Sequence, residues 1–447
     1  MTAFSLHQKY RRTTLRLAAA ILFLLPSLAS LHAADSTYTN PIGGISNIGD
    51  PFVMKTGGSY YMYATSDWRR GFLVWESSNL VDWTKKGLAF DSHQQGNGWG
   101  TTDFWAPEVI HYKDRFIMTY SARAADGKLK IALAQSDDPL GPFINIRTPL
   151  LDSTLTCIDG DLFIDEDGAP YFYFVKDVSD NIVDGKHTSQ IFVQKLLPDS
   201  LKPVGEAIFC MQPSQPWEHP QDEWRWNEGP FMLKNNDLYY LMYSANYFAS
   251  QDYAIGFAVS ESPLGPWTKY SGNPVLSKNL AIDVSGPGHN CVTVSPDGSE
   301  LFIVYHTHTD PEHPGGNRQP NIDRLYFEDD VIRIIGPTRS PQPMPNGVIS
   351  RIGRRADKQA SDFVLHQNVP NPFNSATRIS YHLSHAAQVH LDVYDSRGAR
   401  VLTLVQQRQA PGSYAVEFQA NDLPSGLYFC KLETDGFAVV SKMALVR

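Results

Sequence analysis

Short apolar and aromatic stretches alternate with polar turns through the first three quarters of the chain. Between residues 224 and 246, an acid and a proline precede an apolar segment at 231–234, and an aromatic segment returns at 238–244. The intervening Asn235-Asn236-Asp237 suits a tight turn, because Asn and Asp tolerate left-handed backbone. Tyr, Phe and Met fit a pleated, buried surface. The pattern predicts a β-hairpin.

The same hairpin pattern occurs five times, each time behind a polar residue. The five polar heads are Asp50, Glu108, Asp159, Glu228 and His289. They recur roughly every 50–70 residues, and an all-strand repeat of this length is typical of a propeller, whose single blade cannot bury both of its faces. We therefore expect an all-β protein with a five-bladed β-propeller over residues 35–339.

If the first strand of each hairpin lines the central channel, the five heads meet at one rim. Three of them, Asp50, Asp159 and Glu228, then form a carboxylate cluster suited to glycoside hydrolysis. In that reaction one carboxylate activates water, one carboxylic acid protonates the leaving oxygen, and a third acid can raise the pKa of the donor. The alternative is that each acid belongs to an ordinary turn beside Pro or Gly.

Four further side chains are predicted to bind substrate: Trp68, Trp105, Arg318 and His289. Trp105 is expected to line a sugar pocket, while Glu108 close behind it binds neighbouring backbone. Arg318 is a candidate clamp for sugar hydroxyls, with a surface ion pair as the alternative. The imidazole of His289 should point into the channel as a sugar contact, a metal ligand or a core histidine.

Two other motifs allow metal binding but have simpler interpretations. His306 and His308 share one strand face, which is compatible with a metal site and equally with structural histidines. Asp165-Glu-Asp-Gly168 resembles part of a calcium loop but lacks the further acids of such a loop, so we expect a hairpin tip.

The N-terminus predicts export. Four basic residues before residue 17 precede an apolar run from 17 to 28 and small residues near 33–34, the order found in a secretory signal peptide over residues 1–34. The apolar run is shorter than the roughly 20 residues of a membrane span. Loss of those basic residues would change the net charge from −9 to about −13. Such a charge argues against nucleic acid and anionic membranes as partners.

Beyond the repeats, the chain predicts a linker and a second domain. Residues 340–361 are rich in Pro and then in charge, which is typical of a linker. Residues 362–447 contain short alternating segments at 377–383, 389–394, 413–418 and 427–432, which predict a small β-sandwich. Four cysteines are widely spaced, match no metal pattern and leave disulfide pairing open.

Residues 38 to about 335 resemble glycoside hydrolase family 43. The motifs that carry the resemblance are Asn40-Pro-Ile through Asp50-Pro, Trp105-Ala-Pro-Glu108, Ile158-Asp159, Asn227-Glu-Gly-Pro230 and Gly286-Pro-Gly-His289-Asn290. The resemblance implies that Asp50 is the general base, Glu228 the general acid and Asp159 the acid that tunes its pKa. It also implies inversion, no cofactor for the chemistry, and a calcium or sodium ion in the channel near His289.

The tail resembles the type A sorting domain of the type IX secretion system. The matching segments are 365–374 (Leu-His-Gln-Asn-Val-Pro-Asn-Pro-Phe-Asn), 392–398 and 423–429. This resemblance implies recognition by secretion machinery and a secreted or cell-surface protein without a membrane span after processing. A carbohydrate-binding module of similar size is the alternative.

Together these features predict an exported, inverting α-L-arabinofuranosidase or β-D-xylosidase that acts on plant polysaccharides. An endo-acting arabinanase is the enzymatic alternative, and the loop between Trp217 and Trp226 is expected to decide between them. A catalytically inactive, carbohydrate-binding propeller is the alternative from another class.

Overall fold

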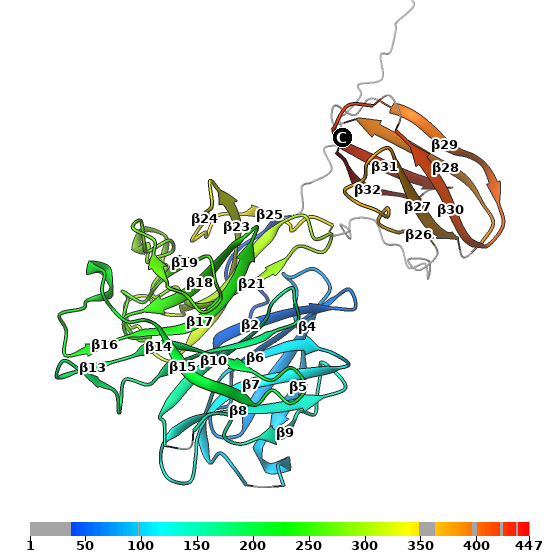
Figure 1. The fold of residues 1–447 in the computed structure, drawn as a ribbon. Coiled ribbons are helices and arrows are strands. Elements are labelled where there is room, and N and C mark those ends of the chain that lie inside the picture. The colour runs from blue at the N-terminus through cyan, green and yellow to red at the C-terminus, as the bar shows by residue number, and fades with distance from the viewer. Residues whose placement is uncertain are drawn as a thin grey trace, which may run out of the picture. The chain divides into compact units, whose positions relative to one another are not determined.

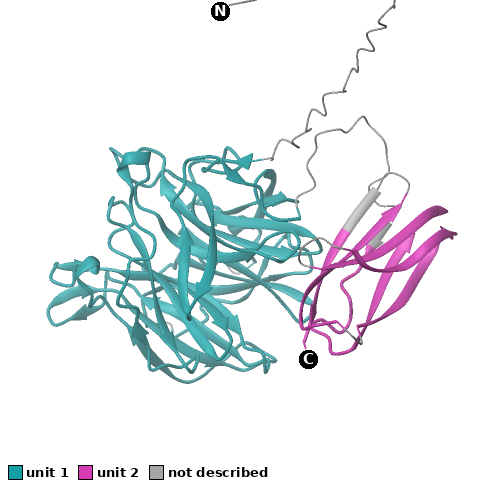
Figure 2. Ribbon diagram, turned by 90° about the horizontal axis from the view of Figure 1, so that it is seen from above, with its two compact units in different colours: residues 1–350 teal, residues 351–447 magenta. Residues whose placement is uncertain are grey.

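The computed structural model describes residues 37–347, apart from 97 and 153, and residues 363–446, apart from 384, 396–399, 421–422 and 435–436. Residues 1–350 and 351–447 form two compact units, coloured separately in Figure 2. The expected signal peptide and most of the expected linker lie outside the described residues. Among the described residues, no helix has the length and apolar character needed to cross a membrane.

Five four-stranded antiparallel sheets follow one another along the first unit (Figure 1). The first two sheets consist of β2 (Gly49–Thr56), β3 (Ser59–Thr65), β4 (Gly71–Ser77) and β5 (Thr84–Asp91), then β6 (Thr102–Tyr112), β7 (Arg115–Arg123), β8 (Leu129–Ser136) and β9 (Ile144–Arg147). The third consists of β10 (Cys157–Ile164), β11 (Pro170–Lys176), β14 (Gln190–Leu196) and β15 (Pro203–Met211). The last two consist of β17 (Asn227–Asn235), β18 (Leu238–Ala245), β19 (Ala254–Ser260) and β20 (Thr268–Lys269), then β21 (Gly288–Val294), β22 (Leu301–His308), β23 (Arg318–Glu328) and β24 (Val331–Ile335).

The first strands of the five sheets form a closed ring. Strand β2 contacts β6, β6 contacts β10, β10 contacts β17, β17 contacts β21, and β21 contacts β2 again. Each sheet is therefore a blade whose first strand is innermost. The prediction of an all-β propeller is confirmed, and the described strands arrange as five blades.

Aromatic residues of the repeated pattern join neighbouring blades. Their rings are buried, and their hydroxyls donate to carbonyls of the next blade. The hydroxyl of Tyr60 in the first blade reaches the carbonyl of Val294 in the fifth at 2.8 Å, and that of Tyr240 in the fourth reaches Asp330 at 3.0 Å. A buried hydroxyl costs stability unless it is paired, so this arrangement lets Tyr fill the core between blades.

The N-terminal segment is fixed to the fifth blade. Strand β1 (Thr37–Tyr38) pairs with β25 (Gln342–Pro343). The side chain of Asn40 donates to the carbonyl of Ile322 at 2.8 Å and accepts from its amide at 2.9 Å. Residues 342–343, which the sequence placed in the linker, thus belong to the first unit.

Shorter elements complete the first unit. The 3₁₀ helices are η1 (Ser92–Gln94), η2 (Pro216–Glu218) and η3 (Leu280–Ile282). A small sheet consists of β12 (Ile182–Val183), β13 (Lys186–Thr188) and β16 (Trp224–Arg225). Residues 165–169 form the tip between β10 and β11, as predicted. The four cysteines are free and buried, which answers the question of disulfide pairing that the sequence left open.

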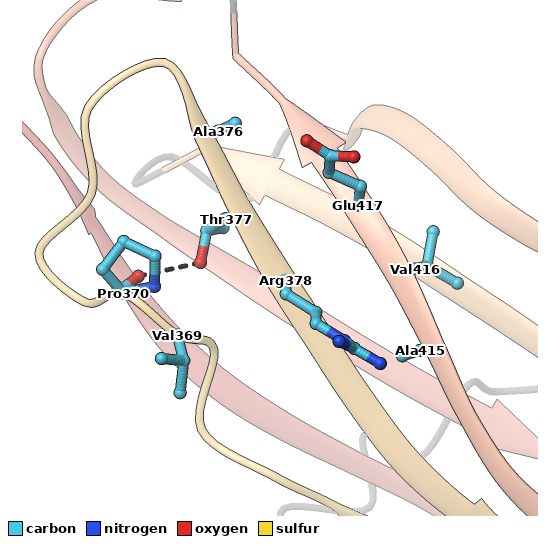
Figure 3. A pocket seen from close by; sticks show the side chains of 8 residues that line it. All are labelled: Val369, Pro370, Ala376, Thr377, Arg378, Ala415, Val416 and Glu417. Atoms are coloured by element: carbon cyan, nitrogen blue, oxygen red, sulfur yellow. Dashed lines mark hydrogen bonds between the residues drawn. The ribbon is translucent and has the colours of Figure 1, made fainter.

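The second unit has two sheets around one apolar core. One sheet contains β26 (Phe363–Leu365), β27 (Ala376–Leu383) and β30 (Gly412–Gln419), and the other contains β28 (Ala387–Asp395), β29 (Arg400–Gln409), β31 (Gly426–Thr434) and β32 (Phe437–Leu445). The expected β-sandwich is present, with β26, β29 and β32 in addition to the four predicted strands. A shallow groove of about 380 Å³ lies beside β27 and β30, where Thr377 donates to the carbonyl of Pro370 at 2.8 Å (Figure 3).

Candidate active site

A cavity of about 640 Å³ lies in the first unit, and all seven predicted site residues line it. They are Asp50, Trp68, Trp105, Asp159, Glu228, His289 and Arg318. These residues come from all five blades and span most of the unit's sequence. The ring of inner strands explains how such distant residues meet in one place.

A β-bulge at the start of each inner strand sets this geometry. The ladder register breaks in all five blades at this point. The residues with positive φ at the bulges are Asp50 (53°), Ala106 (45°), Asp159 (53°), Gly229 (56°) and His289 (49°). Bulges re-aim side chains at the ends of strands, and here they recur at the rim of the channel.

The bulges correct one part of the sequence prediction. Asp50, Asp159 and His289 occupy equivalent positions, but Glu228 lies one residue before the bulge residue of its blade and Glu108 lies two residues after it. The five polar heads are therefore not equivalent. The repeat pattern in the sequence did not reveal this offset, because bulges change the register without changing the hydrophobic pattern.

Asp50 is buried among hydrogen-bond donors and positive charge. Its Oδ1 accepts from Nη1 of Arg318 at 2.7 Å, and its Oδ2 accepts from the hydroxyl of Thr65 at 2.6 Å. Burial by itself would raise the pKa of Asp50, but Arg318, His289 and His306 together with the Thr65 hydrogen bond hold it well below its ordinary range. Asp50 is therefore ionised at neutral pH.

Arg318 reaches Asp50 because residue 49 is Gly. A Cβ atom built there would lie 2.0 Å from Cζ of Arg318, so a side chain would displace the guanidinium. The guanidinium also lies over the ring of Phe248, 5.0 Å from its centroid. Arg318 is 7% exposed, so the alternative of a surface ion pair is wrong.

Glu228 has the opposite electrostatic environment. Burial, and then the negative charge of Asp159, raise the pKa of Glu228 well above its ordinary value, although a hydrogen bond from Tyr253 opposes the shift. The hydroxyl of Tyr253 donates to Oε1 of Glu228 at 2.9 Å. Its ring lies against Gly288, where a Cβ would come within 2.0 Å of Cε1. Glu228 is therefore a carboxylic acid at neutral pH.

Asp159 interacts electrostatically with both Asp50 and Glu228. Its Oδ2 accepts from the amide of Gly229 at 3.0 Å, and its own amide donates to the hydroxyl of Ser121 at 2.9 Å. Burial raises the pKa of Asp159 to about 6, and Asp50 adds to the shift while His289 opposes it. The Gly229 contact fixes the backbone next to Glu228.

The histidines of the fifth blade have protein partners. His306 accepts from the amide of Asp50 at 3.1 Å, and burial lowers its pKa well below the ordinary value. Both ring nitrogens of His308 are within hydrogen-bond distance of protein oxygens, at Ser285 Oγ (2.9 Å) and the carbonyl of Phe248 (2.8 Å). These contacts favour the structural interpretation of the His306–His308 pair.

Nδ1 of His289 lies 3.5 Å from Oδ1 of Asp50, beside the carboxylate cluster. Among the described residues, no group of three or more His, Cys, Asp and Glu side chains could hold a metal ion. Side chains of these four types in the described part of the chain therefore do not by themselves form a cage for the expected calcium or sodium ion.

Glu108 contacts another acid, contrary to the expectation that it binds neighbouring backbone. Its carboxyl group shares a hydrogen bond with Asp161, which also accepts from the amide of Met232 at 2.9 Å. Burial raises the pKa of both acids, to about 7 for Asp161. Asp161 was not predicted as a site residue; it lies two residues after Asp159 on β10, but the bulge between them changes the register, and Asp161 does not line the cavity.

Several other residues at or beside the cavity were also missed. Besides the seven predicted residues, the cavity is lined by Asp177, Thr65, Tyr253, Trp224, Trp226 and Tyr247. Most of them come from loops or from the ends of second strands, where the repeat gives no fixed position. Trp68, Trp224 and Tyr247 are each more than two-fifths exposed, so their rings are free to contact a ligand.

Comparison with protein families matches residues 38–332 to glycosyl hydrolases family 43. This match covers well over half of the chain and includes every residue of the cavity. The chain belongs to glycoside hydrolase family 43. It is therefore a glycosidase, and the prediction from the sequence motifs is confirmed.

Solved and curated relatives agree with this family. A thermostable family-43 glycoside hydrolase is 63% identical, with a TM-score of 0.69, over 70% of this chain and all of the other. An endo-1,4-β-xylanase of Bacteroides thetaiotaomicron is 33% identical, with a TM-score of 0.58, over 68% and 98%. An extracellular exo-α-(1→5)-L-arabinofuranosidase of Streptomyces chartreusis is 27% identical over 65% of this chain and 88% of its own length.

The second unit matches a protein family of its own. Residues 369–446 match the secretion system C-terminal sorting domain. The expectation of a sorting domain is confirmed, and such a domain implies a protein that is secreted or held at the cell surface.

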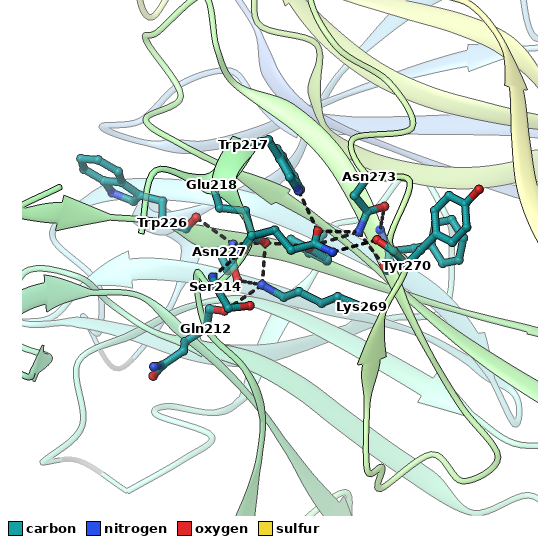
Figure 4. Close-up of polar contacts among 12 residues, drawn as sticks. Gln212, Ser214, Trp217, Glu218, Trp226, Asn227, Lys269, Tyr270 and Asn273 are labelled. Carbon is teal, nitrogen blue, oxygen red and sulfur yellow. Dashed lines mark hydrogen bonds and ion pairs between the residues drawn. The ribbon is translucent and has the colours of Figure 1, made fainter. Parts of the chain in front are cut away.

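A buried ionic network supports the acid side of the family 43 site (Figure 4). Glu218 on η2 is fully buried and accepts from the amides of Ser214 (2.6 Å) and Gln215 (2.7 Å). Nζ of Lys269 donates to Glu218 Oε1 at 2.5 Å and to Oδ1 of Asn227, the residue before Glu228, at 2.8 Å. The network thus joins the loop at 212–218 to the strand that carries Glu228.

Replacing Lys269 with Met should lower the free energy of unfolding by about 3 kcal/mol, because it leaves the buried carboxylate of Glu218 without its counter-charge. Urea unfolding followed by tryptophan fluorescence measures the change. The matched control is Lys278→Met, whose pair with Asp252 is exposed on both sides and should change stability by less than about 1 kcal/mol. Equal effects of the two substitutions would contradict a structural role for the Lys269 pair.

Proposed function

We propose that this family 43 hydrolase is an exported, inverting, exo-acting α-L-arabinofuranosidase or β-D-xylosidase on plant polysaccharides. In this proposal Asp50 is the general base, Glu228 is the general acid and Asp159 tunes the pKa of Glu228. One observation carries the proposal: a single cavity holds one carboxyl group whose pKa is lowered and another whose pKa is raised. With such a pair, one carboxyl group is ionised and can act as the base while the other is protonated and can act as the acid at the same pH.

The reaction would proceed in one displacement. Asp50 takes a proton from a water molecule, and the water oxygen attacks the anomeric carbon from the face opposite the leaving group. The bond from the anomeric carbon to the glycosidic oxygen breaks as Glu228 gives its proton to that oxygen. A water molecule must fit between base and sugar, so we expect the two carboxyl groups to be about 6.5–9.5 Å apart.

Asp159 would act through Glu228. Its negative charge raises the pKa of Glu228, and its hydrogen bond to the amide of Gly229 orients the adjoining backbone. Arg318 would hold Asp50 ionised and in place. The rings of Trp68 and Trp105 at the cavity wall are suited to the apolar faces of sugars.

Curated relatives support the choice of sugar. Two exo-α-(1→5)-L-arabinofuranosidases of Streptomyces, at 27% and 26% identity, and an α-L-arabinofuranosidase of Humicola insolens, at 27%, match the propeller. Their names favour release of a terminal arabinose. Endo action is the second candidate, because aromatic side chains extend the cavity beyond the three acids and the 33% identical structure is an endo-xylanase.

Export would use both ends of the chain. We propose that residues 1–34 are a signal peptide and that residues 340–361 link the propeller to the sorting domain at 362–447. Secretion machinery would recognise the sorting domain, and an oligo- or polysaccharide outside the cell would be the substrate.

Proton NMR of the reaction tests the proposal. We expect release of free sugar from an aryl α-L-arabinofuranoside or an aryl β-D-xyloside, with the first-formed product in the inverted anomeric configuration. Oligosaccharides released from linear arabinan or xylan without any action on aryl glycosides would favour the endo candidate. A first-formed product that retains its configuration would contradict the assignment of Asp50 as base.

A further inference from the structure

Three aromatic side chains that line the cavity form a row of neighbouring rings. Trp226 and Trp224 precede Glu228 on the same segment, and Tyr247 follows β18. The ring centroids of Trp224 and Trp226 are 6.4 Å apart, and those of Trp226 and Tyr247 are 5.3 Å apart. All three residues line the same cavity as the acids. The row is therefore continuous with the candidate active site.

The orientation of the Trp224 ring is fixed by a neighbouring imidazole. Its ring stacks on that of His187 with centroids 3.8 Å apart and an angle of 2° between the planes. Nδ1 of His187 lies 3.0 Å from the carbonyl of Val178, which fixes the imidazole in turn. Trp224 is 43% exposed, so one side of its indole is supported while much of the ring remains open.

The small sheet of β12, β13 and β16 makes this arrangement rigid. Strands β13 and β16 pair in parallel, with His187 opposite Trp224. The next residue, Arg225, is buried and donates to Oγ1 of Thr188 (2.7 Å) and to the carbonyls of Val183 and Pro220 (both 3.1 Å). A buried guanidinium with this many partners fixes the backbone on which Trp224 stands.

We propose that this aromatic row, formed by Trp224, Trp226 and Tyr247, is a binding platform for the sugar rings of the leaving chain. The inference rests on the proposed function, in which Glu228 protonates the leaving oxygen, because the row starts on the strand segment that carries Glu228. An exposed aromatic ring fits the apolar C–H face of a neutral sugar ring. An ordered aromatic ring loses little conformational entropy on binding, which favours its use as a fixed platform.

The platform predicts that the enzyme distinguishes substrates by the group on the leaving side of the scissile bond. We expect Trp224→Ala to lower kcat/KM about tenfold on α-1,5-arabinotetraose or β-1,4-xylotetraose, whichever the enzyme cleaves. On the glycosyl fluoride of the same sugar, whose leaving group is a single atom, the same substitution should change kcat/KM less than about twofold, since fluoride does not reach the platform. Trp224→Phe should fall between the wild type and Trp224→Ala.

The control substitution is Phe209→Ala. Phe209 on β15 of the third blade is also an exposed aromatic residue, but it does not line the cavity. It should leave kcat/KM on the tetrasaccharide unchanged. Thermal unfolding of each variant verifies that the propeller is folded.

A binding measurement separates this inference from the proposed function. Calorimetric titration of Glu228→Gln with the two intact tetrasaccharides, with and without Trp224→Ala, needs no turnover. Weaker binding caused by Trp224→Ala supports the platform even if the wild type hydrolyses neither arabinofuranosyl fluoride nor xylosyl fluoride. Unchanged tetrasaccharide binding and kcat/KM in folded Trp224→Ala would overturn it, and an equal loss on tetrasaccharide and fluoride would assign Trp224 to the sugar that is released.

Discussion

Replacing Glu228 with Gln is expected to lower kcat/KM by about 10³-fold on oligosaccharides, because the amide cannot give a proton to the leaving oxygen. The loss should be much smaller on a 2,4-dinitrophenyl glycoside or a glycosyl fluoride, whose leaving groups depart without protonation. Gln is close to Glu in size, and its side-chain oxygen can still accept from the hydroxyl of Tyr253. Steady-state kinetics on the two classes of substrate measure the difference, and a full rate on oligosaccharides would contradict the acid assignment.

The pH profile tests the same assignment. The pKa of Glu228 is raised, so its protonated, active form is lost as pH rises through that value, and the wild-type rate on oligosaccharides should fall on the alkaline side. In Glu228→Gln this alkaline fall should disappear. An unchanged alkaline limb in the variant would assign that limb to another group.

The fold could be predicted from sequence because each blade repeats one compact pattern. Every innermost strand begins at a bulge and continues as an apolar run, and its partner strand returns with tyrosines that fill the space between blades. Such a pattern survives variation of single residues, since it reflects burial of whole strand faces. The strands β26, β29 and β32 of the second unit were missed; β26 has only three residues and most positions of β29 are not buried, so neither shows a clear apolar alternation.

The three acids were predicted from the same pattern, whereas the hydroxyl groups that contact them were not. Asp50 and Asp159 stand at bulges, so their places follow from the repeat. Thr65 lies at the end of β3 and Tyr253 lies just before β19, in a connection of no fixed length. Each hydroxyl belongs to the same blade as the acid it contacts, but it lies at a strand end or in a connection for which the repeat gives no fixed position. The opposite pKa shifts likewise depend on the tertiary structure: Arg318, far along the chain, lowers the pKa of Asp50, while burial and Asp159 raise that of Glu228.

Replacing Asp50 with Asn should lower kcat/KM by about 10³- to 10⁴-fold on every substrate, because the amide cannot take the proton of the attacking water. In contrast to Glu228→Gln, a better leaving group should not restore the rate. The carbonyl oxygen of Asn can still accept from Arg318, so substrate binding should change less than turnover. Steady-state kinetics on an oligosaccharide and on a glycosyl fluoride measure kcat and KM for each substrate.

Added azide provides the decisive observation for Asp50. In Asp50→Asn, azide needs no base and can attack the anomeric carbon from the position that water leaves, giving a glycosyl azide of inverted configuration by NMR. The matched control is Asp91→Asn, which removes a carboxylate paired with Arg70 at 2.7 Å outside the cavity and should leave turnover unchanged. A glycosyl azide of retained configuration, or wild-type turnover in a folded Asp50→Asn variant, would show that another group activates the water. An inverted azide product, together with the loss on all leaving groups and an inverted first-formed sugar from the wild-type enzyme, would assign Asp50 as the base. The wild-type product is needed because a variant that lacks the nucleophile of a retaining enzyme would also give an inverted azide.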